Sequence, residues 1–164
     1  MEFHMKLPRN KKEFALFMAI VSIISVNIIA PLITCMEMGF SLATWQNALR
    51  VMPFIWLSVI ALVLLTYQPA EWMTGKIADK NDSFHAHIII NILCTVFLMS
   101  IFLTVIGTWI GMGQITLAPV TGFLTNGKWP RNFAVSFAVE LLIAQPIARF
   151  VLYRIHLVAD RKTQ

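Results

Sequence analysis

The sequence predicts an all-α integral membrane protein, a four-helix bundle built from two parallel helical-hairpin repeats. Hydrophobic residues make up 58% of the 164, mean hydropathy is +0.73 and only 13% of residues are charged, a composition too apolar for a soluble domain. A helix needs roughly 20 mostly apolar residues to cross a bilayer. Four stretches meet that requirement, 14–39, 48–67, 87–111 and 132–152. Because they leave only short connections, residues 5–164 are expected to form one membrane domain.

Prolines and glycines mark particular points within these spans. Pro31 lies inside the first span and is expected to kink it just beyond Asn27. Gly107 and Gly111 form a Gly-x-x-x-Gly pair in the third span, which allows another helix to approach closely. The approaching helix could belong to the same chain or to a second copy in a homodimer. In the fourth span, Pro146 is expected to mark a second kink.

The three connections differ in character. The first, 40–50, is short and amphipathic, and the second, 68–87, is the most polar stretch of the chain. The third, 113–131, is rich in proline and glycine and is expected to be irregular. Trp45 and Trp129 are expected to anchor the first and third connections at the membrane surface.

The charges predict an orientation and exclude one class of partner. The formal net charge is +5 and the isoelectric point is near 9.6. If the N-terminus is cytoplasmic, most basic residues fall on that side, as the positive-inside rule requires. The predicted location is therefore a bacterial cytoplasmic (inner) membrane, with both termini in the cytoplasm. Anionic lipid headgroups account for the basic rim, so the lipid bilayer is the expected partner and nucleic acid is not. Ten basic residues are placed inside (Lys6, Arg9, Lys11, Lys12, Lys76, Lys80, Arg149, Arg154, Arg161 and Lys162) and three outside (Arg50, Lys128 and Arg131).

The chain is expected to divide into two similar halves, about 11–80 and 85–162, after a cloning scar predicted at residues 1–4. The pairs Glu2-Phe3 and His4-Met5 are what two common restriction sites encode in frame. The second span of each half ends in a Gln-Pro dipeptide, Gln68-Pro69 and then Gln145-Pro146. Two hairpins of the same orientation make this a parallel repeat, related by an axis along the membrane normal.

Short motifs in both halves resemble a bacterial family of integral membrane proteins. They are Asn10-Lys11-Lys12-Glu13 before the first span, Glu140, and the run Gln145-Pro146-Ile147-Ala148-Arg149. With these motifs the chain resembles the family called domain of unknown function 2798, as two tandem two-helix units. The first half departs from the pattern, because Val63 stands where the second half has Glu140. The resemblance implies a fold and a membrane location, and it carries no activity.

Glu140 is the leading candidate for a functional residue. It lies near the middle of the fourth span with no basic residue adjacent in sequence. An ionised carboxylate at the bilayer centre costs several kcal/mol, so Glu140 should be protonated, face a polar cavity or bind a cation. Ser136 and Asn132 precede it at intervals of four residues and extend a polar stripe along one helix face.

Other polar residues come out at about the same depth as Glu140. They are Asn27, Ser58 and Ser100, so a midplane polar cluster is predicted. Its members could form a proton or substrate site, or they could hydrogen-bond one another and hold the helices together. In the second case Asn27 would be the expected partner of Glu140.

Two functional hypotheses follow, and neither is enzymatic. No Walker loop, dinucleotide fingerprint, zinc-protease helix or nucleophile elbow is present, and no cofactor or metal site is predicted. The first hypothesis is a small secondary transporter or efflux protein for a small or cationic solute, which uses Glu140 as its proton or cation site. The alternative is a membrane accessory or scaffold protein that transports nothing, in which Glu140 and Asn27 specify helix pairing.

Overall fold

The computed structural model describes residues 7–79, 82–122, 124 and 127–161, and in this part of the chain helices are the only regular secondary structure. The predicted cloning scar lies outside the described residues. Four helices are long and apolar enough to cross a membrane, namely Lys11–Met38, Leu42–Ile77, His85–Met112 and Lys128–Asp160. Each corresponds to one predicted span, so the prediction of an all-α chain with four long apolar helices is confirmed.

Side-chain caps fix where α1 (Lys11–Met38), α2 (Leu42–Ile77) and α3 (Phe84–Met112) begin. At the start of α1, the Asn10 side chain accepts a hydrogen bond from the Glu13 amide, and the Glu13 carboxylate accepts one from the Arg9 amide. This arrangement is a variant of the capping box, because the returning bond goes to the residue before the cap. Ser41 and Ser83 cap the next two helices by accepting a hydrogen bond from the amide three residues on. After Gly39, whose φ is +92°, the chain can leave α1 and turn back into α2.

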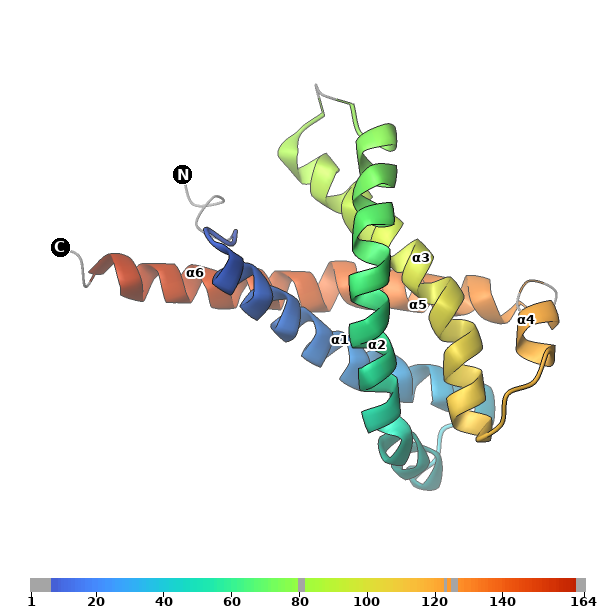
Figure 1. Cartoon of the computed structure of the whole chain (residues 1–164). Helices are drawn as coiled ribbons and strands as arrows, with labels where there is room; N and C mark the ends of the chain where they lie inside the picture. Colours follow the sequence, from blue (N-terminus) through green and yellow to red (C-terminus); the bar gives the residue numbers. More distant parts are fainter. Residues whose placement is uncertain (1–6, 80–81, 123, 125–126, 162–164) are drawn as a thin grey trace.

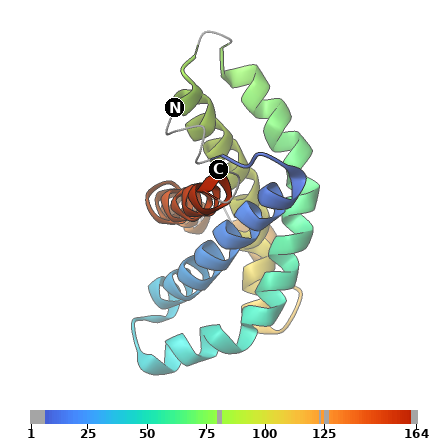
Figure 2. The ribbon, with the colours of Figure 1, turned by 90° about the vertical axis from the view of Figure 1, so that its left-hand side faces the viewer.

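α2 is longer than its predicted span, with 36 residues that include Pro53 and Pro69. The amphipathic segment predicted as a connection is therefore mostly the first part of this helix. Figure 2 shows that α2 runs across the end of the molecule before bending upward. Pro53 gives a physical reason for this bend, because its ring crowds the carbonyl group four residues earlier and it donates no amide hydrogen bond.

The fourth long helix consists of three consecutive parts, α5 (Lys128–Val139), the π-helical segment Glu140–Ala144 and α6 (Gln145–Arg161). A short helix, α4 (Ala118–Gly122), precedes it within the connection that was predicted to be irregular. The buried positions along the fourth helix are spaced by five residues across the π-helical segment, from Val139 to Ala144. One extra residue is therefore accommodated there.

The long helices cross at wide angles and splay apart (Figure 1). α1 packs against α2 on one side and against the fourth helix on the other. On the first side, Val26 of α1 clusters with Met52 and Val59 of α2. On the second side, Val21 packs against Ala144 and Ala148, both of which are 0% exposed. α3 packs against α5 and the π-helical segment but makes no close backbone approach to α6 in the described part of the chain.

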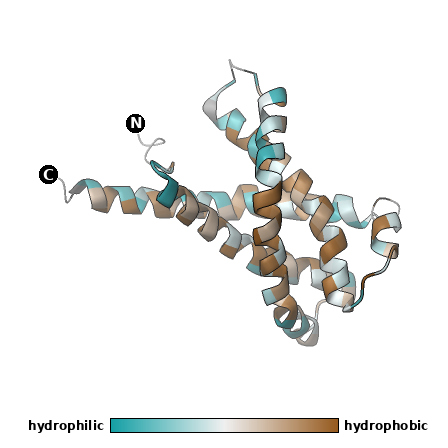
Figure 3. Ribbon diagram, viewed as in Figure 1, coloured by the Kyte–Doolittle hydropathy of each residue, from teal (hydrophilic) through white to brown (hydrophobic). Residues whose placement is uncertain are grey.

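Most apolar side chains face outward. Only 22 to 28% of the most apolar window of each long helix is buried inside the molecule. In Figure 3 the middles of α2 and α3 are hydrophobic, whereas the start of α1 and the end of α2 are more hydrophilic. The exposed side chains include Leu57 at 67%, Leu64 at 77% and Leu142 at 71%. A surface of this kind is compatible with a lipid environment and costly in water.

The Gly107 and Gly111 pair makes no close contact with another helix in the described part of the chain. A methyl group added at either position would have no described atom within 4 Å. We therefore expect Gly107→Ala to raise the stability of the monomer by about 0.5–1 kcal/mol, because alanine restricts the unfolded chain and favours the helix. A thermal melt in detergent beside wild type measures this effect. A lower melting temperature together with loss of a dimer would instead show that the glycines contact a second copy.

Candidate functional site

Glu140 lies at the contact between the fourth helix and α1. Its Oε1 atom accepts a hydrogen bond of 2.6 Å from the Ser25 hydroxyl. Its Oε2 atom is buried and has no hydrogen-bond partner among the described residues. A buried polar atom without a partner costs free energy and is uncommon in native proteins. The carboxyl group thus has one satisfied oxygen and one oxygen that can accept a proton or a ligand.

The π-helical segment that carries Glu140 has a cause in the sequence. Pro146 has no amide hydrogen, and its ring would crowd the Leu142 carbonyl of a regular α-helix. The chain widens just before this proline, and the Gln145 amide donates to the Glu140 carbonyl, five residues back. Single π-helical turns recur at functional sites because they reorient nearby groups. By contrast, α1 runs through the buried Pro31 without a change of helix type.

The predicted midplane cluster does not assemble around Glu140. Asn27 is exposed, and its side-chain amide donates to the Ile23 carbonyl of its own helix at 2.7 Å. It lies two residues beyond Ser25, a rotation of about 200° around an α-helix, and so points away from the fourth helix. The Ser58 hydroxyl donates to Phe54 on α2. Ser100 is buried and accepts a hydrogen bond from the Trp129 indole, which turns that tryptophan toward α3.

The predicted polar stripe of Asn132, Ser136 and Glu140 contacts two different neighbours. Asn132 is buried, and its amide donates to the Thr104 hydroxyl of α3 at 3.2 Å. Glu140 bonds to α1 instead. Eight residues separate the two, which rotates the second by about 80° from the first. No side-chain hydrogen bond of Ser136 is found within the described ranges.

Glu37, near the end of α1, joins two cations of α5. Its carboxylate lies 3.0 Å from the Arg131 guanidinium and 3.6 Å from the Lys128 ammonium. Arg131 also donates to the Asn132 side chain at 3.2 Å. These contacts fix the end of α1 against the start of α5, at the edge of the apolar region.

We expect Glu37→Gln to lower stability by about 1 kcal/mol, because Lys128 and Arg131 lose their shared counter-ion. The loss should shrink as salt is added, since the pairs are partly exposed. Chemical denaturation at low and high salt measures both effects. Glu71→Gln is the matched control, because among the described residues the Glu71 carboxylate only accepts a hydrogen bond from Asn91, and glutamine can accept one as well. Equal effects of the two substitutions would contradict this prediction.

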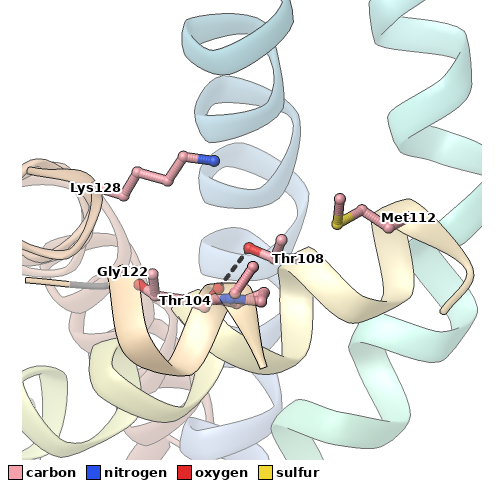
Figure 4. Close-up of a pocket in the computed structure, with 7 residues that line it drawn as sticks. Thr104, Thr108, Met112, Gly122 and Lys128 are labelled. Carbon is pink, nitrogen blue, oxygen red and sulfur yellow. Dashed lines mark hydrogen bonds between the residues drawn. The ribbon is translucent and has the colours of Figure 1, made fainter. Parts of the chain in front are cut away.

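Two cavities lie away from Glu140. One, of about 120 Å³, lies between α3, α4 and the start of α5 (Figure 4). The other, of about 510 Å³, is an open depression where the N-terminal segment meets Tyr67. The smaller cavity is lined by Thr104, Thr108, Met112, Ala118, Pro119, Gly122 and Lys128.

At the opposite end of α1, an ion pair and a histidine–carboxylate contact join the start of this helix and the residue before its cap to the end of α6. The Arg9 guanidinium bonds both oxygens of Asp160, at 2.9 and 3.1 Å, and this carboxylate raises the pKa of Arg9. The His156 ring is 1% exposed and lies 3.0 Å from the Glu13 carboxylate. The contact between α1 and the fourth helix therefore has polar pairs at its end and at Glu140, with apolar packing between.

Sequence reasoning missed Ser25, the partner of Glu140, and chose Asn27 two residues away. The prediction of Asn27 as the partner of Glu140 rests on its depth along the span, and depth does not distinguish the faces of a helix. The positions of the apolar residues around Ser25 indicate which face of α1 it occupies. Ser25 lies four residues after Val21 and one before Val26, on the side of α1 that packs against the rest of the chain. Asn27 lies four residues after the exposed Ile23.

Comparison with known proteins adds no relative. No family model matches the chain, and neither the curated proteins nor the solved structures contain a significant match.

Proposed function

We propose that the four long helices cross a lipid bilayer, with both termini on the cytoplasmic side of a bacterial inner membrane. The outward apolar surface and the clustering of cations on one side support this topology. Two tandem hairpins, as the family resemblance implies, fit the contact between α1 and α2 and between α3 and the fourth helix. The halves differ at their Gln-Pro dipeptides, because α2 is α-helical through Pro69 whereas a π-helical segment precedes Pro146.

Within this membrane topology, the protein is a small secondary transporter or efflux protein for a small or cationic solute. The observation that carries this proposal is the Glu140 carboxyl group, whose Oε1 atom bonds Ser25 while its buried Oε2 atom has no hydrogen-bond partner among the residues that the structure describes. Ionisable residues inside membrane spans commonly mark proton or ion pathways, because their burial is otherwise costly. Glu140 is the coupling site for a proton or a cation.

The arrangement gives this site a way to act on the helices. Binding a proton or a cation at Oε2 changes the charge of a group that is hydrogen-bonded to α1 through Ser25. The same change alters how well the fourth helix packs against α1 around Val21 and Ala144. Within the described residues, α3 makes a close backbone approach to the π-helical segment but none to α6, so a shift of α6 disturbs α3 less than a shift of the π-helical segment would. Loading of Glu140 is thus coupled to the position of α1 relative to α6.

Aqueous accessibility at position 140 tests the proposal without knowledge of the substrate. Glu140→Cys is made with Cys35 and Cys94 changed to alanine, because both are buried and alanine adds no polar atom. Membrane-impermeant thiol reagents are then applied from each side of sealed vesicles. Ala144→Cys, at a fully buried position, and Leu142→Cys, at an outward one, are the controls. Labelling at 140 well above both controls is expected for a residue on a water-filled path.

The alternative, a membrane accessory or scaffold protein that transports nothing, is favoured by one contact. The Ser25 to Glu140 hydrogen bond joins two helices in the manner expected of a purely structural pair. In that case position 140 should stay unlabelled from both sides in folded protein, while a cysteine outside the membrane reacts normally. This outcome would overturn the transporter proposal and leave the scaffold.

A further inference from the structure

One face of α1 carries a regular seam that the other helices cover only in part. Its positions are separated by four, three, four, three and four residues, the spacing of a coiled-coil contact line. Ile23 is 53% exposed and Leu16 is 41% exposed, whereas Ile20 and Ala30 are half-buried against the clusters that α1 shares with the fourth helix and with α2. In Figure 2 α1 runs diagonally across the molecule, between α2 and the end of α6. The seam consists of Leu16, Ile20, Ile23, Asn27, Ala30 and Thr34.

Asn27 lies at the middle of this seam and is exposed. One hydrogen of its amide bonds the Ile23 carbonyl at 2.7 Å. The second amide hydrogen and the Oδ1 atom have no partner among the described residues. Thr34 and Ser58 differ in this respect, because each donates its single hydroxyl hydrogen to its own helix. In the bilayer, lipid chains cannot bond the remaining donor and acceptor of Asn27, so leaving them exposed is costly.

We propose that this seam is a homodimer interface, in which α1 of one copy packs against α1 of a second copy. The occupant follows from the chemistry of Asn27, since an amide carries both a donor and an acceptor. Two such groups on a two-fold axis along the membrane normal satisfy each other, N–H to Oδ1 in both directions. A single asparagine in an apolar heptad seam is also known to fix register and oligomeric state. The parallel orientation follows because both copies insert in the same sense.

The interface is separate from the proposed transport site. Ser25, which bonds Glu140, lies on the opposite side of α1, so dimer formation leaves this contact in place. The inference rests only on the membrane topology of the proposed function. Failure of Glu140 as a transport site would not affect it.

Fluorescence energy transfer between labelled copies in liposomes, measured as lipid is added, tests the interface. Wild type is expected to dimerise, and Asn27→Leu should weaken the dimer by about threefold to thirtyfold, the range given by membrane hydrogen bonds. Ser58→Leu is the matched control and should leave dimerisation unchanged, because that hydroxyl is satisfied within α2. A wild-type protein that stays monomeric at all lipid dilutions overturns the proposal.

Disulfide trapping provides a second test that does not depend on the Asn27 substitution. In the background without Cys35 and Cys94, Ile23→Cys should cross-link rapidly upon oxidation, because equivalent seam positions meet across the two-fold axis. Leu57→Cys, 67% exposed on α2, should cross-link only slowly through random collisions. Equal rates at both positions, or faster trapping at Gly107→Cys, would place the contact elsewhere and contradict the α1 seam.

Discussion

Replacement of Glu140 by glutamine is expected to reduce coupled transport at least tenfold while leaving the protein folded. Glutamine keeps an oxygen that can accept the Ser25 hydrogen bond, but it neither carries a charge nor exchanges a proton. Purified protein in liposomes, with a pH-sensitive dye inside, can be tested with imposed gradients of K⁺, methylammonium and tetraphenylphosphonium. Proton movement that depends on one of these cations in wild type should be absent in Glu140→Gln.

Stability measurements on the same variants separate function from structure. The buried Oε2 atom makes no hydrogen bond to any described residue, so Glu140→Gln and Glu140→Leu should melt at or above the wild-type temperature. Ser25 can tolerate the leucine by donating to a carbonyl of its own helix, as Ser58 does on α2. If the protein keeps Glu140 although replacing it raises stability, that observation favours a functional role for Glu140. A marked fall in stability with both substitutions would instead support the structural alternative.

The second large effect is expected from Ala148→Leu. Ala148 is 0% exposed and packs against Val21 of α1 and Ala144 of the π-helical segment. A leucine there has no space and must push α1 away from α6, so stability should fall by about 1–3 kcal/mol. A reversible detergent titration followed by circular dichroism measures the change. The control is Ala138→Leu, because Ala138 is exposed on α5.

If Ala148→Leu and Ala138→Leu have the same small effect, α1 and α6 are not tightly packed at this point. That result would also remove the proposed link between Glu140 and the position of α6. A loss confined to Ala148→Leu would confirm that small residues in the fourth helix allow the close approach of α1. Transport in the two variants can then be compared at a temperature where both remain folded.

The four long helices could be predicted because a run of apolar residues can be recognised from the order of residues along the chain, without knowledge of which residues contact one another. The face that each residue presents could not, since every span is apolar around most of its circumference and periodicity gives little contrast. Asn27 and Ser25 illustrate this, because they have nearly the same depth but point in opposite directions. The Glu13 to His156 and Glu37 to Arg131 pairs were also missed. Each joins residues far apart in sequence, and only the packing of the helices brings them together.

Helix length and helix face explain the remaining differences. α2 extends beyond its apolar core because Ser41 caps it before the apolar run begins, whereas the span had been predicted from hydropathy. Pro146 predicts that the regular helix is interrupted, but the form of the interruption depends on whether the preceding turn widens or the helix bends. The turn widens, and this places Val139 and Ala144 on the same buried side.

The wide turn before Pro146 also determines where the fourth helix can gain or lose a residue during evolution. A turn closed by a five-residue hydrogen bond holds one residue more than an α-helical turn, while the helix on either side keeps its direction and its buried face. Losing one residue between Leu141 and Ile143, with Pro146 replaced so that a regular turn is tolerated, would shorten that bonded loop to the ordinary four-residue closure. The faces of α5 and α6 would remain aligned, whereas a deletion elsewhere in the helix would rotate everything beyond it by about 100°. This segment is therefore the place in the fourth helix where a single-residue insertion or deletion can be absorbed during evolution.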